Sequence, residues 1–264
     1  MGSIRERASK YSGAKLAELR PQYFSVTFGA GGSTLSYTPE TVERLRAVHG
    51  LDAAPHISCV GGTRAELAAL LDRYREMGCG RLVALRGDLP SGMARMGDLR
   101  NATDLVAFIR AEHGDWFHIE VGCYPETHPQ SNCAQNDLAN FRRKVDAGAD
   151  AAITQYFFNP DAYFRFVDDA RRCGIEVPIV PGIMPVSNFS QLRRFSEMCG
   201  AEIPRWIATR MAGLGDDAAA IRELGADVVA CMCSALIRGG APALHIYTLN
   251  RAKATTAVLE RIDA

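Results

Sequence analysis

This sequence of 264 residues lacks the features that mark membrane, secreted and nucleic-acid-binding proteins. No apolar run approaches the ~20 residues that a membrane span needs, and the first seven residues contain no apolar signal-peptide core. Lys plus Arg number 30 and Asp plus Glu also number 30, so no charge excess favours nucleic acid or an anionic membrane. We therefore expect a cytoplasmic protein that binds neither nucleic acid nor membranes.

The eight cysteines include no C-x-x-C pair, which argues against a zinc site or a redox dithiol. Cys231 and Cys233 lie two residues apart in a predicted helix, so their side chains point to different faces. We interpret the cysteines as small buried hydrophobic residues in a reducing compartment.

Motifs for nucleophilic and metal catalysis are also missing. The sequence has no G-x-S-x-G and no H-x-H, H-x-x-x-H or E-x-x-H pair. A metal-dependent hydrolase stays a less favoured alternative, with ligands drawn from His56, His128, His245, Glu126 and Asp88.

Strand-like and helix-like segments alternate with a period of roughly 30 residues, the length of a βαβ unit. The predicted strands cover residues 23–28, 55–59, 81–85, 117–122, 151–157, 178–180 and 243–247. The predicted amphipathic helices include residues 63–77, 102–112, 135–147, 161–173, 190–199 and 217–238. No linker rich in Pro, Gly or Ser interrupts the pattern, so we expect one domain over residues 1–264.

Two parallel α/β architectures compete, an open doubly wound sheet and a closed (β/α)₈ TIM barrel. The only glycine-rich loop, residues 29–34, has Thr34 where G-x-G-x-x-G requires its third glycine, and no P-loop lysine follows. A barrel better explains polar residues at the ends of many strands. Only seven strands can be counted, and because the chain opens with a helix-like segment at 5–19, the missing strand would be the first.

The ends of the predicted strands carry the residues best suited to chemistry. Arg86, Gly87 and Asp88 follow the buried strand 81–85, and aromatic and hydrogen-bonding residues follow the strands ending near 122, 157 and 247. Such a mouth suits a large, flat, partly apolar ligand held by a few polar groups. The amide of Gln155 is expected to face a pocket and to suit a heterocycle with adjacent donors and acceptors.

Asp137, Asn140 and Lys144 share one face of a predicted helix because they are spaced by three and four residues. That face could hold a phosphate or a ribose. The alternative is that Lys144 forms an ordinary surface ion pair.

Together these segments resemble the methylenetetrahydrofolate reductase family, from about residue 5 to the C-terminus. The resemblance lies in Tyr124-Pro125-Glu126-Thr127-His128-Pro129 and in residues 25–34, 54–56, 83–90, 144–149, 153–155, 181–189 and 247–250. It implies a TIM barrel that binds FAD at its mouth. It also implies a ping-pong reaction, in which NADH or NADPH reduces FAD and 5,10-methylenetetrahydrofolate then accepts the hydride to become 5-methyltetrahydrofolate. A homo-oligomer is compatible with this reading.

The resemblance also assigns site residues. The positions that match cofactor contacts are Thr27, Ala30, His56, Arg86, Gly87, Asp88, Ala102, Tyr124, His128, Asp137, Asn140 and Lys144. Those that match substrate contacts are Gln155, Gln191, Phe195 and Arg251, with Thr27 serving there as well. Asp88 and Gln155 are the expected catalytic residues: Asp88 would lie near the flavin pyrimidine and tune its potential, and Gln155 would bind the pterin.

The family begins with a strand of the form Phe-Glu-Phe-Phe-Pro-Pro, whose glutamate is the general acid, and this sequence contains no such segment. The resemblance therefore implies impaired folate reduction, since loss of a general acid costs ~10²–10⁴-fold in rate. The alternative function is a non-catalytic barrel that binds flavin or folate. Two smaller departures from the family's pattern are Phe28, where many relatives carry Tyr, and Asn101, where an aromatic residue is common. We expect both to weaken flavin binding.

Overall fold

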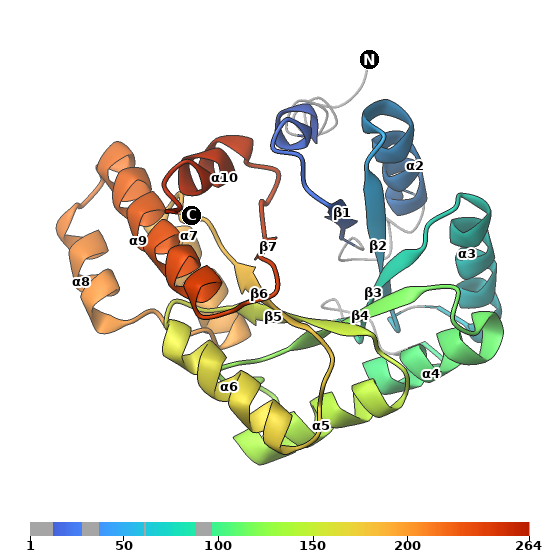
Figure 1. Ribbon diagram of the computed structural model, residues 1–264. Coiled ribbons are helices and arrows are strands. Elements are labelled where there is room, and N and C mark those ends of the chain that lie inside the picture. The colour runs from blue at the N-terminus through green and yellow to red at the C-terminus, as the bar shows by residue number, and fades with distance from the viewer. Residues whose placement is uncertain (1–12, 28–36, 61, 88–96, 264) are drawn as a thin grey trace. The chain divides into compact units, whose positions relative to one another are not determined.

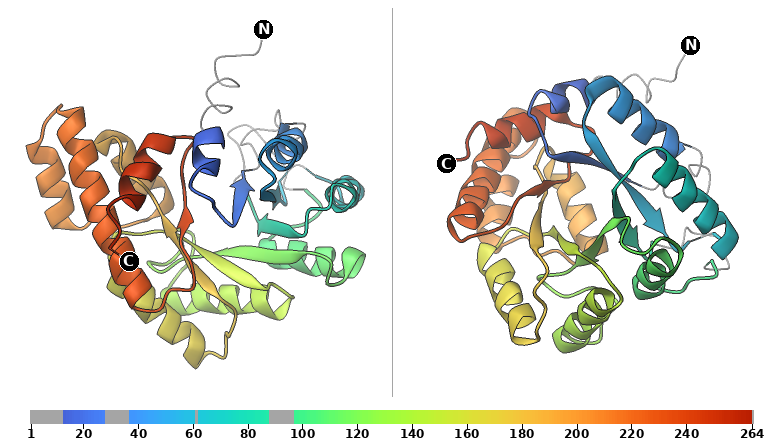
Figure 2. Two further views of the ribbon diagram at one scale, coloured as in Figure 1. Left: turned by 45° about the horizontal axis from the view of Figure 1, so that its top comes forward. Right: turned by 45° about the vertical axis from the view of Figure 1, so that its right-hand side comes forward.

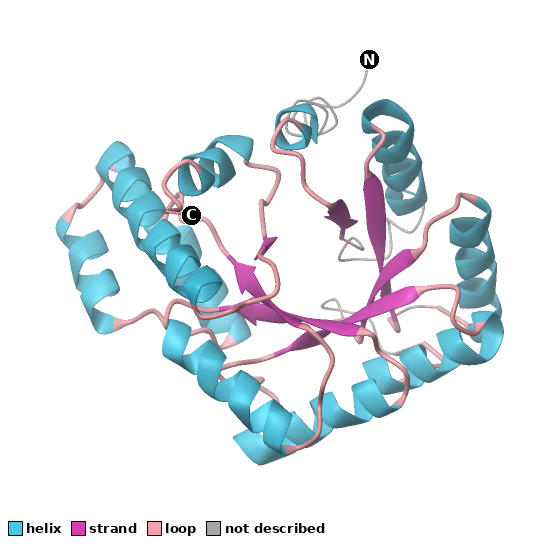
Figure 3. Cartoon of the chain, in the orientation of Figure 1, coloured by secondary structure: helices cyan, strands magenta, loops and turns pink. Residues whose placement is uncertain are grey.

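The computed structural model describes residues 13–27, 37–60, 62–87 and 97–263. Strands and helices alternate along this part of the chain (Figure 3). The strands are β1 Tyr23–Val26, β2 Asp52–Ser58, β3 Arg81–Leu85, β4 His118–Cys123, β5 Ala151–Tyr156, β6 Ile179–Ile183 and β7 His245–Ile246. The labelled helices are α2 Tyr37–His49, α3 Arg64–Glu76, α4 Ala102–His113, α5 Ala134–Asp146, α6 Pro160–Arg172, α7 Phe189–Cys199, α8 Arg205–Gly213, α9 Ala218–Arg238 and α10 Ala252–Leu259.

The seven described strands follow chain order in the sheet, and the strand pairs β1–β2, β2–β3, β3–β4 and β6–β7 are parallel. Parallel neighbours in sequence order, each joined through a helix, are the arrangement of the TIM-barrel class, which confirms the predicted fold. All seven predicted strands are present, with ends shifted by a few residues. Helices α2, α8 and α10 are additions to the predicted set.

Local sequence accounts for the places where the helices begin. Helix α3 starts with a capping box, in which the Thr63 hydroxyl accepts from the Glu66 N–H and the Glu66 carboxylate accepts from the Thr63 N–H. Asn101 and Asn188 cap α4 and α7 with a single side-chain contact, each accepting the N–H three residues later. These caps fix the point at which the chain turns from a strand end into a helix.

The chain forms two compact units. Residues 20–122 and 141–152 make the unit that we call the β1–β4 unit. Residues 123–140 and 153–264, with the described part of 1–19, make the β5–β7 unit. The expectation of one domain over residues 1–264 stays a prediction.

In the β1–β4 unit, helices α2, α3 and α4 lie along the outer side of the strands (Figure 1). The core between them is apolar and fully buried, with Ile57, Leu71, Tyr74, Leu82 and Ile109 among its members. In the β5–β7 unit, α9 and α10 lie side by side in both views of Figure 2. The described residues contain no helix long and apolar enough to cross a membrane.

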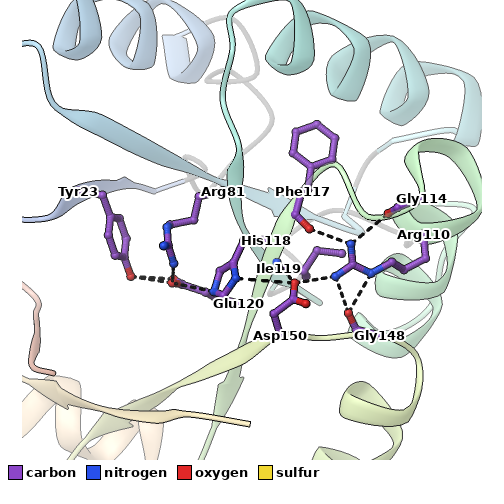
Figure 4. A network of polar contacts seen from close by, with 10 residues as sticks. All are labelled: Tyr23, Arg81, Arg110, Gly114, Phe117, His118, Ile119, Glu120, Gly148 and Asp150. Carbon is purple, nitrogen blue, oxygen red and sulfur yellow. Dashed lines mark hydrogen bonds and ion pairs between the residues drawn. The ribbon is translucent and has the colours of Figure 1, made fainter. Parts of the chain in front are cut away.

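A buried carboxylate ties β1, β3 and β4 together (Figure 4). The Tyr23 hydroxyl lies 3.0 and 2.8 Å from the two carboxylate oxygens of Glu120, and Arg81 Nη1 donates to the same carboxylate at 2.9 Å. The side chain of Glu120 is only 4% exposed, and the Arg81 guanidinium lies 4.8 Å from the centre of the Tyr23 ring. Tyr23 and Arg81 are the first residues of their strands, so this network joins the amino ends of β1 and β3 to β4.

A second polar cluster continues from it. Arg110 of α4 donates to Asp150 at 2.6 Å and to the carbonyl of Gly148 at 2.7 Å. The Asp150 carboxylate accepts from the N–H of Ile119 at 2.6 Å. Burial and the neighbouring Arg81 lower the pKa of His118, which lies between the two carboxylates (Figure 4). These contacts hold the amino-terminal edge of the β1–β4 unit together and leave the opposite ends of the strands for other residues.

We expect Glu120→Gln to lower the free energy of unfolding by about 2 kcal/mol, because it removes the buried charge that Tyr23 and Arg81 both contact. Urea unfolding followed by circular dichroism measures this difference. The matched control is Asp146→Asn, which removes a carboxylate from an exposed pair with Arg142 and should cost less than about 0.5 kcal/mol. Equal effects of the two variants would contradict a structural role for Glu120.

Candidate active site

In the β1–β4 unit, the loop after β3 approaches the end of β2 very closely. Gly87 has a φ of +78°, and a Cβ at this position would lie 2.0 Å from Ser58 Oγ. The Ser58 hydroxyl donates to the carbonyl of Arg86 at 3.1 Å and accepts from the N–H of Val60 at 3.1 Å. Only glycine fits here, because the Ser58 side chain fills the space that a side chain at position 87 would need.

Two cations lie at the ends of the neighbouring strands β3 and β4. Arg86 follows β3 directly, is half-buried, and donates from Nε to the carbonyl of Gly87 at 3.2 Å. Lys144 reaches back from α5 and donates from Nζ to the carbonyl of Gly122, in β4. Since β3 and β4 are paired in parallel, both cations belong to the carboxyl edge of the sheet. The Lys144 ammonium therefore contacts the backbone of β4, and its role as a phosphate ligand or as an ordinary ion pair stays a prediction.

These residues fit a diphosphate. A guanidinium and an ammonium are hydrogen-bond donors that phosphates prefer. Two other predicted cofactor residues, Ala30 and Asp88, lie outside the described residues.

The remaining predicted residues of this unit lie near the same edge. Thr27 is exposed just after β1, and its carbonyl accepts from the Thr38 hydroxyl at 3.4 Å. His56 is buried within β2. Ala102 is the first residue of α4, whose cap Asn101 also accepts from the Cys59 thiol at 3.2 Å through its carbonyl. Asn101 thus fixes the start of α4 against the end of β2.

In the β5–β7 unit, three predicted cofactor residues are brought together by the loop after β4. The rings of Tyr124 and His128 meet edge to face with centroids 4.5 Å apart. The carboxylate of Asp137 accepts from the N–H of His128 at 2.9 Å. Asp137 therefore holds this loop, while Asn140 lies one helical turn further along α5. The sequence predicted that Asp137 shares a helix face with Asn140 and Lys144. Only the structure shows that the Asp137 carboxylate also contacts the loop after β4.

The predicted substrate residues come from β5, α7 and the segment after β7. The amide oxygen of Gln155 accepts a hydrogen bond from the N–H of Tyr156 at 3.0 Å. This oxygen is therefore already engaged with the neighbouring backbone. Gln191 and Phe195 lie one turn apart in α7. The expectation that Gln155 faces a pocket stays a prediction.

Three contacts that sequence reasoning missed fix these elements. The Tyr156 hydroxyl lies 3.0 Å from Ser196 Oγ and joins β5 to α7. The Thr154 hydroxyl accepts from the N–H of Gly182 at 2.8 Å, and its carbonyl accepts from the Tyr247 hydroxyl at 2.8 Å. No pattern in the sequence signals these pairs, because their members lie between 28 and 93 residues apart.

Arg251 is the predicted residue nearest the C-terminus. It is exposed before α10 and donates from Nη1 to the Ser187 hydroxyl, which joins the segment after β7 to the one before α7. The guanidinium is thereby oriented while it stays accessible to an anionic ligand.

A cavity of about 600 Å³ opens between the loop after β4, α5 and α6. Among the described residues predicted to bind cofactor or substrate, Tyr124 and Asp137 line it. Its other walls include Glu126, Arg165, Phe166 and Glu202. Sequence reasoning gave no indication of this cavity, because the α6 side chains resemble an ordinary solvated helix face.

The cysteines differ in burial and form no disulfide. All eight are free thiols, and burial raises the pKa of Cys59 and of Cys233 to about 12, which keeps them protonated. The expectation that the cysteines are buried is wrong for Cys133, Cys173 and Cys231, which are exposed on loops or outer helix faces. Cys231 and Cys233 do point to different environments, as predicted.

Metal catalysis gains no support from the described residues, which hold no group of three His, Cys, Asp or Glu residues placed to bind an ion. Of the ligands weighed for a metallohydrolase, His56 and His245 lie in strands β2 and β7, and Asp88 lies outside the described residues.

Comparison with known proteins matches residues 9–263 to the family described as methylenetetrahydrofolate reductase. The chain belongs to the methylenetetrahydrofolate reductase family. It is 43% identical over 244 residues to the 5,10-methylenetetrahydrofolate reductase of Escherichia coli, covering 92% of this chain and 81% of that one. It is 35% identical over 258 residues to methylenetetrahydrofolate reductase (NADH) 1 of Arabidopsis thaliana, covering 93% of this chain and 44% of that one. The family is one of oxidoreductases.

The fold is shared with proteins of little sequence similarity. A protein from Clostridium thermocellum that binds two copies of 5-methyl-5,6,7,8-tetrahydrofolic acid matches 98% of this chain and 91% of its own, with a TM-score of 0.64 at 13% identity. A 2,3-dimethylmalate lyase matches 94% of this chain and 76% of its own, with a TM-score of 0.53 at 11% identity. At these identities the matches establish the architecture only.

The histidine of β7 makes the stability of this family member depend on pH. Burial lowers the pKa of His245 to about 4, whereas in the unfolded chain it would titrate near ~6.5. Between these values the unfolded state binds more protons, so stability is complete above pH ~6.5 and falls as the pH drops towards 4. Because His245 keeps some solvent exposure, we expect the free energy of unfolding to fall by about 2 kcal/mol, which is less than the full difference between the two pKa values would give.

Urea unfolding at pH 7 and pH 4.5 measures the effect, with His245→Gln as the control that cannot titrate. Between pH 7 and pH 4.5 the unmodified protein should lose more unfolding free energy than His245→Gln, by most of the expected loss of about 2 kcal/mol. Identical pH dependence would show that His245 is not responsible.

Proposed function

We propose that this chain reduces 5,10-methylenetetrahydrofolate to 5-methyltetrahydrofolate, using FAD and electrons from NADH or NADPH in a ping-pong reaction. The observation that carries the proposal is the similarity to relatives named 5,10-methylenetetrahydrofolate reductase, at 43% identity over 92% of the chain. The cations Arg86 and Lys144 at neighbouring strand ends support it, because they suit the diphosphate of FAD. We also propose the cytoplasm as its compartment, which agrees with eight free thiols.

FAD, when bound, would supply the chemistry of hydride transfer between the nicotinamide and the folate. The chain's part is to bind and orient. Arg86, Lys144 and the backbone at Gly87 would hold the diphosphate, and His56, Ala102, Tyr124, His128, Asp137 and Asn140 would complete the cofactor site. Asp88 would lie against the pyrimidine side of the flavin and make extra negative charge there unfavourable.

The substrate would be held by residues of β5, α7 and the segment after β7. The amide of Gln155 would bind the pterin, whose ring edge offers adjacent donors and acceptors. Phe195 would stack on a flat ring, and Gln191 would add a hydrogen bond. Arg251, oriented by Ser187, would pair with the carboxylates at the glutamate end of the folate. The effect of lacking the Phe-Glu-Phe-Phe-Pro-Pro segment on folate turnover stays a prediction.

The absorption spectrum of the purified protein, before and after anaerobic addition of NADH or NADPH, tests this function. We expect a flavin band near ~450 nm that is bleached by nicotinamide and restored only slowly by 5,10-methylenetetrahydrofolate, because the family's general acid is missing. A band that NADH and NADPH both leave unchanged would indicate the non-catalytic flavin-binding barrel. A protein that stays colourless after FAD is added would overturn the proposal.

Lys144→Met should weaken FAD binding by about tenfold, because a charge-assisted contact to the diphosphate is lost. The matched control is Arg143→Met, which removes a positive charge from the adjacent, exposed position of α5. Quenching of flavin fluorescence gives both dissociation constants, and thermal unfolding checks that both variants are folded. Equal dissociation constants would show that Lys144 does not contact the cofactor.

A further inference from the structure

Two contacts join the loop after β4, residues 124–133, to the carboxyl end of α7. The carboxylate of Glu126 accepts from the backbone N–H of Glu202 at 2.8 Å, although the two residues lie 76 positions apart. Three residues further along the loop, Pro129 packs against Gly200, which ends α7 with a φ of +74°. A Cβ at position 200 would lie 2.8 Å from Pro129 Cγ, so the two segments touch without a gap.

The loop is held in a conformation that needs such support. Thr127 has a φ of +74°, in the left-handed region that a β-branched residue rarely adopts. Such a residue persists only where its surroundings impose the conformation. Glu126, next to it, is half-buried. Burial raises the pKa of its carboxyl group, and the hydrogen bond from the Glu202 N–H opposes the rise.

The joined segments carry different parts of the proposed site. The loop contributes Tyr124 and His128, which belong to the cofactor side. Helix α7 contributes Gln191 and Phe195, which belong to the substrate side. Helix α7 is also held near its carboxyl end, where Ser196 meets the Tyr156 hydroxyl at 3.0 Å. The Glu126–Glu202 contact therefore links the loop on the cofactor side to the helix on the substrate side.

We propose that Glu126 is a positioning residue, which holds the end of α7 against the loop after β4 and so keeps the substrate residues at a fixed spacing from the cofactor residues. This inference rests on the proposed function for its effect on catalysis. The contact itself does not depend on that function.

The interaction uses the side chain of Glu126 but only the backbone of Glu202, and this asymmetry provides the controls. Glu126→Ala removes the acceptor, whereas Glu126→Gln keeps an oxygen acceptor in the same place. Glu202→Ala keeps the N–H and should behave like the unmodified protein. Glu202→Pro removes the N–H and should act like Glu126→Ala.

The first measurement is hydrogen–deuterium exchange over residues 189–202 in the holoenzyme. We expect faster exchange in Glu126→Ala and in Glu202→Pro, and unchanged exchange in Glu126→Gln and Glu202→Ala. Joining Glu126→Ala with Glu202→Pro should add little to either single change, since both remove the same bond. Unchanged exchange in Glu126→Ala would overturn the inference, whether or not the protein reduces folate.

The second measurement is steady-state kinetics with 5,10-methylenetetrahydrofolate. In Glu126→Ala we expect KM to rise by about tenfold with a smaller change in kcat, and Glu126→Gln to restore most of the loss. Faster exchange with an unchanged KM would show that the contact is structural only, and would overturn the positioning role. If the unmodified protein transfers no electrons from NADH or NADPH, the proposed function fails, and the exchange measurement still decides whether Glu126 holds α7.

Discussion

Parallel pairing of successive strands is the constraint on which the site depends. Each strand ends at the same edge of the sheet as its parallel neighbours, so the residue that follows it reaches that edge whatever its place in the sequence. Arg86 shows this directly, because it follows β3, whereas Lys144 reaches the backbone of β4 from α5, the next element along the chain. The pairing of β3 with β4 places both of these contacts at the carboxyl edge of the β1–β4 unit.

The amino-terminal edge of the same strands carries polar contacts that stabilise the fold. There the Glu120 carboxylate accepts hydrogen bonds from Tyr23 and Arg81. The Asp150 carboxylate accepts them from Arg110 and from the N–H of Ile119. The buried carboxylate is tolerable because a hydroxyl and a guanidinium satisfy it. Charges that stabilise the fold thus lie at the amino edge, while charges suited to a ligand lie at the carboxyl edge. This separation lets the site vary without disturbing the interactions that hold the strands.

Close packing sets the remaining geometry of the site. Gly87 and Gly182 each lie where a Cβ would fall about 2 Å from a neighbouring oxygen, Ser58 Oγ and the Thr154 carbonyl oxygen respectively. At Gly182 the neighbours are β5 and the Tyr247 ring, so the three strands of the β5–β7 unit meet without room for a side chain. The loop after β4 is held in a similar way by Asp137, Glu126 and Pro129, each of which contacts a different partner.

The sequence by itself determined the order of the seven described strands, most of the helices that separate them, and the residues placed just after each strand. These are local properties: alternating apolar runs, capping residues and turn residues act over a few positions. The sequence also determined the family, because it contains the motifs of methylenetetrahydrofolate reductases in the same order and at the same spacing. Only the tertiary structure decided which of these residues meet. The hydrogen bonds of Glu126 with Glu202, of Tyr156 with Ser196 and of Lys144 with Gly122 join residues far apart in the chain, and no local pattern encodes such contacts. They follow from packing, which depends on every element at once.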